Sequence, residues 1–342
     1  MLFKVPAIKR DSGRNMANEI RAVVIGGVLV VMIAAQIAVS PNILISAGTL
    51  LDYFIKLMMS VTSIGLIAAG VTLVIITGNN DISSGSIMMV AAIMSCTIAK
   101  DLSETMNPAF VGVLAVLVPL IVGLLCGAFN GLLVGVLKLN AFVTTMSTMY
   151  AYQGLVMLYN SGKAVWAPDL PVFSFIGHAR LFFIPFPIIL LALSFMALGF
   201  ILHRTVFGRK IYAVGGNPLA ARFSGIDSRY VVFIAYTAAG LMAGLSGVFV
   251  GSWTNSADLL MGTGKEFNAI TAVVLGGAAL SGGTGTMGGT VLGVLFMGTL
   301  EMFYIQFNIS VMMQWLIKGI LMIAVIYING ALEASQNRRK SS

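Results

Sequence analysis

Long apolar runs separated by short polar segments follow one another along the whole chain. Most of them approach the roughly 20 residues that an α-helix needs to cross a bilayer. The eleven candidate runs are 22–40, 43–58, 60–77, 83–99, 110–137, 141–160, 184–203, 229–252, 268–285, 288–308 and 312–332. This pattern predicts an all-α polytopic membrane protein.

Basic residues between the runs indicate which loops face the cytoplasm, because short cytoplasmic loops are rich in Lys and Arg. The segment 204–229 carries five Lys or Arg residues, the first 21 residues carry five more, and the tail contains Arg338-Arg339-Lys340. We therefore expect both termini and the 204–228 loop in the cytoplasm, and the weakly charged linker 161–183 outside.

Two termini on one side require an even number of crossings, so one candidate run must not span. We interpret 43–58, which contains Asp52 and Lys56, as a short re-entrant or interfacial segment. About ten transmembrane helices remain, five before and five after the external linker. Two five-helix halves would have inverted orientations, a common transporter design. The expected layout is a cytoplasmic N-terminal segment 1–21, a single transmembrane domain 22–332 and a cytoplasmic tail 333–342.

Composition supports the membrane assignment. Of the 342 residues, 58% are hydrophobic and 9% are charged, whereas a soluble domain carries about 25% charged residues. The net charge of +8 could indicate nucleic-acid binding, but the cations lie in loops between apolar runs, so we assign them to topology and expect no nucleic acid.

Nucleotide-binding and metal-binding motifs lack their required context. Gly262-Thr263-Gly264-Lys265 is followed by Glu266, so it is not a phosphate-binding loop, and the glycines from Gly283 to Gly288 lie between apolar runs without a βαβ unit. Both histidines, His178 and His203, fall near predicted span ends. We expect no cofactor, no metal and no catalytic site on this chain; a partner subunit would hydrolyse any ATP used.

Two series of glycines at four-residue spacing each follow one helix face. They are Gly123, Gly127, Gly131 and Gly135, and then Gly285, Gly289 and Gly293. Such stripes let helix backbones approach closely. Static packing and a sliding, pore-lining helix are both compatible with the pattern.

Polar residues inside or beside apolar runs are candidates for a substrate path. Asn79, Asn80 and Asp81 follow one run directly and Ser83 opens the next, so they could cap that helix or line a path. The further candidates are Thr144, Thr145, Asn268 and Thr271. Glu301 and Lys318 also lie within or near runs, where ionisable residues suggest function, although these two could simply pair with each other.

The 204–228 loop contains a predicted short helix. Asn217 can cap it, Pro218 suits its first position and Gly225 can end it. A capped helix parallel to the membrane would be a suitable contact for a cytoplasmic partner. The residues assigned to this contact are Asn217, Pro218, Leu219, Ala220, Ala221, Arg222 and Gly225.

Four blocks of the sequence together resemble the membrane permease subunits of bacterial ABC importers, in the branch serving ribose, xylose, galactose and related monosaccharides. The superfamily also holds branched-chain amino acid permeases. The blocks are Thr77–Ser86, Asn140–Thr145, Phe207–Ile226 and Glu266–Gly289, and the resemblance extends from about Ile20 to Leu332.

The resemblance implies a permease in the bacterial inner membrane, working as a homodimer or heterodimer. It also implies two ABC ATP-binding subunits, or one fused duplicated ATPase, and a periplasmic or lipid-anchored substrate-binding protein. The stretch from Asn217 to Gly225 is then expected to carry the coupling helix. Alternative cargoes within the superfamily are autoinducer-2, a nucleoside or an amino acid. Alternatives from other classes are an ion-coupled secondary transporter and a non-transporting membrane scaffold or receptor.

Overall fold

The structure, a computed structural model, describes residues 12–40 and 46–341 and is almost entirely helical. Its helices are α1 (Ser12–Val39), α2 (Ala47–Ile76), α3 (Ser84–Leu102), α4 (Pro108–Gly131), α5 (Ala141–Asn160), α6 (Pro171–His178), α7 (Phe186–Arg204), α8 (Val206–Gly216), α9 (Pro218–Phe223), α10 (Ser228–Thr254), α11 (Lys265–Leu275), α12 (Met287–Gln306) and α13 (Val311–Ser341). A π-helical turn, Leu132–Val136, extends α4. The strands β1 (Val165–Trp166) and β4 (Ser256–Ala257) pair antiparallel, as do β2 (Arg180–Leu181) and β3 (Ile184–Pro185).

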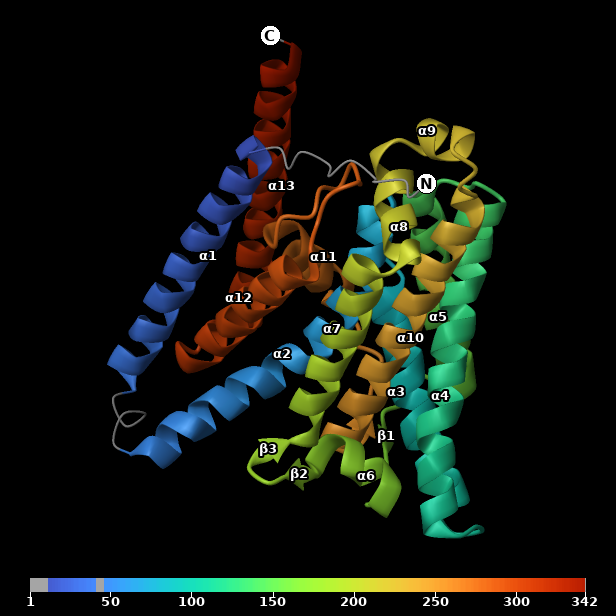
Figure 1. The fold of residues 1–342 in the computed structure, drawn as a ribbon. Coiled ribbons are helices and arrows are strands. Elements are labelled where there is room, and N and C mark those ends of the chain that lie inside the picture. Colours follow the sequence, from blue (N-terminus) through green and yellow to red (C-terminus); the bar gives the residue numbers. More distant parts are fainter. Residues whose placement is uncertain (1–11, 41–45, 342) are drawn as a thin grey trace, which may run out of the picture.

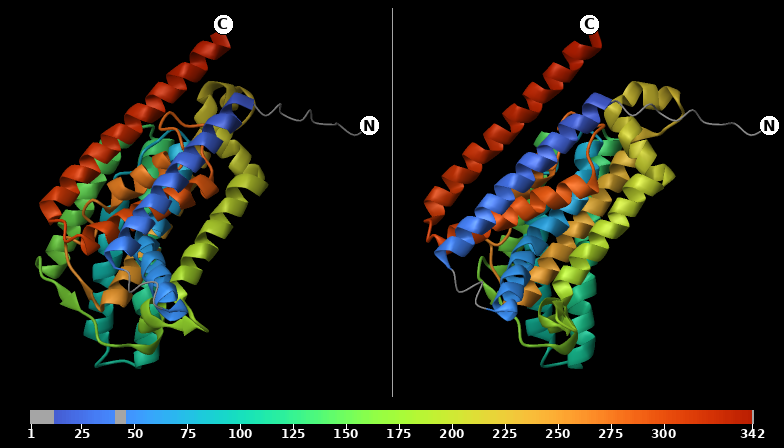
Figure 2. Two further views of the ribbon diagram at one scale, coloured as in Figure 1. Left: turned by 90° about the vertical axis from the view of Figure 1, so that its left-hand side faces the viewer. Right: turned by 60° about the vertical axis from the view of Figure 1, so that its left-hand side comes forward.

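The long helices run between two ends of one bundle (Figure 1). We call one the α9 end, because α8 and α9 lie there, and the other the α6 end, where α6 and the β2–β3 hairpin lie. Helix α1 begins and α13 ends at the α9 end, as the views in Figure 2 also show. The start of α1, the end of α13 and the 205–227 segment therefore share one end. The side chains of 1–21 and of the tail 333–342 lie outside the described part.

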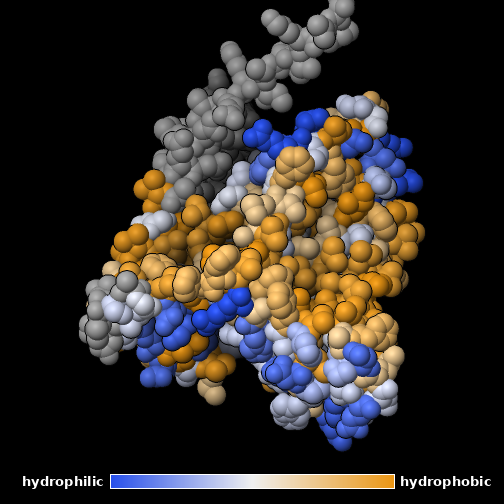
Figure 3. Space-filling model, turned by 60° about the horizontal axis from the view of Figure 1, so that its bottom comes forward, coloured by the Kyte–Doolittle hydropathy of each residue, from blue (hydrophilic) through white to orange (hydrophobic). Residues whose placement is uncertain are grey.

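A hydrophobic belt separates the two ends. In Figure 3, apolar side chains cover the middle of the molecule, and hydrophilic side chains gather toward both ends. Six described helices are long and apolar enough to cross a membrane, and 23–39 and 311–327 are shorter apolar helices. The chain is therefore an all-α polytopic membrane protein.

The expected span at 268–285 is wrong. Helix α11 ends at Leu275, and residues 276–286 form a glycine-rich loop in which Gly277, Gly282 and Gly283 have positive φ. Eleven residues of α-helix rise only about 16 Å, less than the hydrocarbon core of about 30 Å. The count of ten spans is therefore not confirmed.

The described part of 43–58, from Ser46 on, is not a separate re-entrant segment; 41–45 lie outside the described residues. From Ala47 to Ile76 the chain is one continuous helix, and a capping box between Ser46 and Thr49 starts it. Its 30 residues extend about 45 Å, so its first turns reach beyond the hydrocarbon core. This is why Asp52 and Lys56 are tolerated near its start.

The first glycine stripe packs α4 tightly on α10. A Cβ on Gly123 would lie 2.8 Å from the carbonyl oxygen of Gly240, and a Cβ on Gly127 would overlap the carbonyl oxygen of Tyr236. The stripe therefore lets the two helix backbones pack closely. The second series is not a single stripe, because Gly285 lies in the 276–286 loop with φ of +143°, whereas Gly289 and Gly293 belong to α12 and face α11.

Helix α2 is the most completely buried of the candidate spans and packs on α10, α11 and α12. Two loops that connect helices lie close to each other in this part of the bundle. The first, residues 77–83 between α2 and α3, contains Asp81 and leads into Gly85 of α3; the second, residues 255–264 between α10 and α11, contains Asp258 and Gly262. Each aspartate accepts a hydrogen bond from the backbone two residues later, and a Cβ on either Gly85 or Gly262 would collide with the other's backbone.

Candidate functional site

Asp81 is the centre of a buried hydrogen-bond network at the start of α3. Its Oδ1 accepts from the backbone N–H and the hydroxyl of Ser83, at 2.9 and 2.7 Å, and its Oδ2 accepts from the hydroxyl of Ser84 at 2.8 Å. The carboxylate faces the N-terminus of α3, where the helix dipole stabilises a negative charge.

The same network joins α3 to α4 and α5. The Asn130 side-chain amide donates to Ser83 Oγ at 2.7 Å, and the backbone N–H of Ile82 donates to Thr145 Oγ1 at 3.2 Å. Ser83 and Thr145 are fully buried. For Asp81, Ser83 and Thr145 the geometry supports helix capping and clamping rather than an open path.

Asn79, Asn80 and Thr144 lie at the edge of this network. The Asn79 amide donates to Thr77 Oγ1 at 3.0 Å, and the carbonyl of Asn80 accepts from the Tyr236 hydroxyl at 2.7 Å. Thr144 is buried beside Thr145 at the start of α5. The structure thus brings six of the predicted path residues together around the loop between α2 and α3.

Asn268 and Thr271 lie apart from these six, in a cavity of about 350 Å³ between α11 and α13. The Asn268 amide donates to Glu301 Oε1 at 3.2 Å. Lys318 Nζ lies 3.5 Å from the same oxygen and Lys265 Nζ lies 3.8 Å from it. We call Lys265, Asn268, Glu301 and Lys318 the Glu301 cluster.

The Glu301 cluster carries two cations and one anion, each about a quarter exposed. Ionisable groups at such positions in a membrane protein mark functional sites by default. The pairing of Glu301 with Lys318, raised from the sequence, is confirmed. Sequence analysis did not assign Lys265 to a site. It noted Lys265 next to Glu266 only when it excluded a phosphate-binding loop.

Helix α5 contacts α3, and helix α13 contacts α11. Both α5 and α13 carry exposed aromatic side chains on their outer faces. Ser147 and Tyr150 are exposed on α5, and Trp315 is exposed on α13, near the cavity of the Glu301 cluster. The other exposed side chains of both helices are mostly apolar, among them Leu155, Leu158, Leu316 and Ile323.

The predicted helix after Asn217 is present as α9. Asn217 Oδ1 accepts from the backbone N–H groups of Leu219 and Ala220, at 3.1 and 3.0 Å, and Pro218 occupies the first turn. Gly225 follows with φ of +76°, a conformation that favours glycine. Helix α9 protrudes at its end of the bundle (Figure 1).

The surface of α9 is apolar and accessible. Phe223 is 91% exposed and Leu219 is 68% exposed, whereas Ala221 is buried toward the bundle. Sequence analysis assigned Leu219 to this contact but not Phe223, although Phe223 directly follows Arg222, which it did assign. Exposed large apolar side chains at a membrane protein's polar end indicate an interaction surface.

Helix α8 connects α9 to the bundle centre. A Cβ on Gly215 would collide with the carbonyl oxygen of Ile76, which also accepts from the backbone N–H of Gly283 at 2.8 Å. The Tyr212 hydroxyl donates to the carbonyl of Gly285 at 2.7 Å. Burial raises the pKa of Tyr212 to about 12, so the phenol keeps this proton at neutral pH. Helix α8, which precedes α9, therefore lies against the last turn of α2 through close backbone contacts.

The fold and these sites define a polytopic α-helical membrane protein with a polar intramembrane cluster and an exposed amphipathic helix at one end. Comparison with known families gives the finer assignment: the family described as branched-chain amino acid transport system / permease component matches residues 53–326. The chain belongs to this family.

Similar proteins include the ribose import permease protein RbsC of Bacillus subtilis (strain 168), 36% identical over 276 residues that cover 80% of this chain and 84% of the relative. The L-arabinose transport system permease protein AraH of Escherichia coli (strain K12) is 33% identical, over 78% and 79% of the two chains. The autoinducer 2 import system permease protein LsrC of Photorhabdus laumondii is 35% identical, over 79% of each. No solved structure matches the chain.

Proposed function

We propose that this chain is the transmembrane subunit of an ATP-driven importer that carries a monosaccharide across the bacterial inner membrane. The relatives' ribose and arabinose import names support the cargo, and the family supports the permease role. The main observation behind the mechanism is the capped helix α9, on which Leu219 and Phe223 are exposed. The helix before it, α8, contacts the buried helix α2 through Gly215.

The α9 end is assigned to the cytoplasm, with both termini and the 204–228 loop, because the basic residues concentrate in these segments. Two ATP-binding subunits, or one fused duplicated ATPase, would contact α9. A periplasmic or lipid-anchored binding protein would dock at the α6 end. The permease domain is 22–332, with no bound cofactor of its own.

We assign the substrate path to the side formed by α5, α11 and α13. Asn268 and Thr271 would line it, next to the Glu301 cluster. A second permease copy, identical or related, would cover this side and complete the path. Asn79, Asn80, Asp81, Ser83, Thr144 and Thr145 would instead set the position of α3 at its border.

The chain is proposed to consist of two inverted halves. Helices α2 and α3 and the segment 77–83 between them correspond to α10 and α11 and the segment 255–264 between them. Contacts support this: α10 packs on α4 and α3, and α2 packs on α12 and α11. The touching glycines Gly85 and Gly262 would lie near the pseudo-two-fold axis, about which the halves can rock.

The direct test of function is uptake in a bacterial host that lacks its own systems for the sugars tested. Cells expressing this chain with its genomic neighbours would be offered labelled ribose, arabinose, galactose and xylose, and autoinducer-2, which the similarity to LsrC keeps as an alternative cargo. We expect uptake of a monosaccharide that is lost when this chain is deleted. Selective uptake of autoinducer-2, a nucleoside or an amino acid would overturn the cargo assignment, and energisation by an ion gradient without ATP would overturn the importer class.

A further inference from the structure

A second cavity, of about 790 Å³, lies at the α6 end and plays no part in the mechanism above. Its walls come from the first half of α2, the segment around β2, and the ends of α10 and α12. Cavities that bind small molecules have volumes of about 300–1,000 Å³. Figure 3 views this end, where hydrophilic side chains flank a hollow. We call it the outer cavity.

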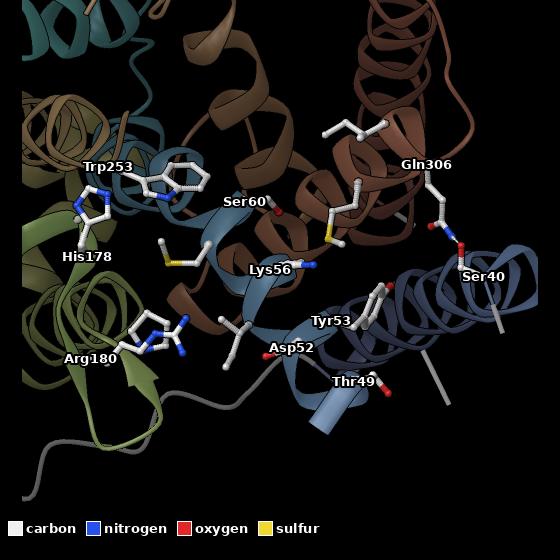
Figure 4. Close-up of a pocket in the computed structure, with 16 residues that line it drawn as sticks. Ser40, Thr49, Asp52, Tyr53, Lys56, Ser60, His178, Arg180, Trp253 and Gln306 are labelled. Carbon is white, nitrogen blue, oxygen red and sulfur yellow. Dashed lines mark hydrogen bonds between the residues drawn. The ribbon is translucent and has the colours of Figure 1, made fainter. Parts of the chain in front are cut away.

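Charged side chains line opposite walls of the outer cavity. Asp52 and Lys56 lie one turn apart on α2, and Arg180 lies on β2; Figure 4 shows them facing a common space. All three are exposed. Both ion pairs closer than 4 Å among the described residues belong to Glu301, so these three side chains have no ion-pair partner there. One carboxylate acceptor and two cationic donors remain able to bind a ligand.

An aromatic ring completes the chemistry. Trp253, at the end of α10, lines the cavity, is 42% exposed and stacks on Phe249, with ring centroids 5.6 Å apart and an interplanar angle of 11°. Met59 and Met302 add apolar lining. A fixed indole beside polar groups suits a ligand with an apolar ring face and a hydroxylated edge.

The position of the cavity relates it to transport. Helix α2 continues from Asp52 to Ile76, whose carbonyl receives the hydrogen bond from Gly283 next to α8. One unbroken helix thus joins the outer cavity to the segment that carries α9. A ligand that contacts Asp52 and Lys56 would therefore bind directly to the first turns of this helix.

We propose that the outer cavity binds a monosaccharide, as a separate site at which the sugar rests after release from the binding protein. Asp52 accepts hydrogen bonds from sugar hydroxyls, Lys56 and Arg180 donate to them, and the Trp253 ring covers the C–H face. The assignment of the ligand as a sugar rests on the proposed function. A merely interfacial role for the charges, with their heads in water at the membrane surface, requires no sugar binding.

The test uses the full-length chain in nanodiscs, with Trp166→Phe and Trp315→Phe leaving Trp253 as the single tryptophan of the three. Its fluorescence is followed while ribose, arabinose, galactose or xylose is added, against sorbitol of equal osmolarity. We expect a saturable change with at least one sugar, with a Kd on the order of 1 mM. No saturable change with any of them overturns the proposal.

Matched variants locate the binding. Asp52→Ala and Arg180→Ala should each weaken binding about tenfold, which corresponds to loss of about 1.4 kcal/mol. Asp101→Ala and Lys163→Ala, which alter exposed charges at the same end but outside the cavity, should bind as the parent does. Equal effects in both pairs overturn the assignment to this cavity.

Uptake by the complete importer separates this proposal from the proposed function. Uptake without saturable binding to the nanodisc sample overturns the outer cavity alone. Saturable binding, lost in Asp52→Ala, without uptake of any sugar overturns the importer assignment and leaves the cavity.

Discussion

The backbone N–H of Gly283 donates to the carbonyl of Ile76 at 2.8 Å and ties the loop after α11 to the last turn of α2. Gly215, at the end of α8, lies against the same carbonyl. Three segments distant in sequence meet here through backbone atoms, with no side chain between them to absorb a displacement. We interpret this junction as the point where movement of α9 reaches the membrane helices.

Gly215→Ala tests the junction. Its Cβ would collide with the Ile76 carbonyl and lie 2.6 Å from the backbone nitrogen of Gly283. Overpacking of this kind costs about 1–3 kcal/mol and would move the end of α8 away from Ile76, so we expect uptake to fall while the chain still reaches the membrane. Gly216→Ala is the matched control, because a Cβ there has no atom within 4 Å. Wild-type uptake by the Gly215 variant would contradict the role of the junction.

Phe223→Ala tests α9 as a contact for the ATPase. The ring is 91% exposed, so its removal should leave the stability of the permease unchanged. If a partner covers it, ATP-dependent uptake should fall while membrane level and melting temperature stay constant. Phe200→Ala is the control, since Phe200 is 64% exposed on the apolar helix α7 and lies outside both proposed docking ends. Equal uptake by the two variants would show that α9 is not the contact.

Gly225→Val and Asn217→Ala test how rigid α9 must be. Valine at φ of +76° adds backbone strain of about 1–3 kcal/mol, and loss of the Asn217 cap costs about 1 kcal/mol. We expect both variants to reach the membrane with uptake uncoupled from ATP hydrolysis, measured as sugar transported per ATP. An unchanged ratio would count against a mechanical role for this helix.

The Glu301 cluster makes a charge-balance prediction. Glu301→Gln leaves Lys265 and Lys318 near each other without their common anion, so transport should fall. Glu301→Gln combined with Lys318→Met removes one cation and should recover part of the loss, measured as initial uptake rate. Glu104→Gln, in the exposed turn before α4, serves as control. A double variant worse than the single one would show that the charges act independently.

The α4–α10 interface can be tested by stability alone. Gly127→Ala places a Cβ against the Tyr236 carbonyl and within 2.8 Å of Gly240, whereas Gly154→Ala meets no atom within 4 Å. We expect the first to lower the melting temperature in detergent, in line with a cost of about 1–3 kcal/mol, and the second to leave it unchanged. Equal melting temperatures would indicate that the helices separate easily and that the stripe permits sliding.

The sequence pattern was sufficient for features that depend on local chemistry. Apolar run length predicted most membrane helices, and the Asn217, Pro218 and Gly225 pattern predicted α9, because capping involves neighbouring residues. Windows of hydropathy failed at 43–58 and 268–285. At 43–58, charged residues near the start of α2 were interpreted as the end of a separate segment. At 268–285, the apolar composition continues past Leu275, where α11 ends.

The site was predicted only in part, for a related reason. Polar residues in the loop between α2 and α3 could cap a helix or line a path. The sequence could not decide between these roles, because their hydrogen bonds with α4 and α5 depend on tertiary packing. The Lys265–Glu301 ion pair joins α11 to α12, and the outer cavity is formed by several segments that are far apart in the sequence. Contacts between residues this far apart in the sequence cannot be predicted from spacing along one helix.

The most direct test of the central claim is sugar accumulation in proteoliposomes, with and without the ATP-binding subunits and the binding protein. We predict that the chain alone transports nothing uphill, and that the complete assembly accumulates sugar only when ATP is supplied. This ATP-driven accumulation should fall in Phe223→Ala. Uphill accumulation by this polypeptide alone, driven by an ion gradient, would contradict the account.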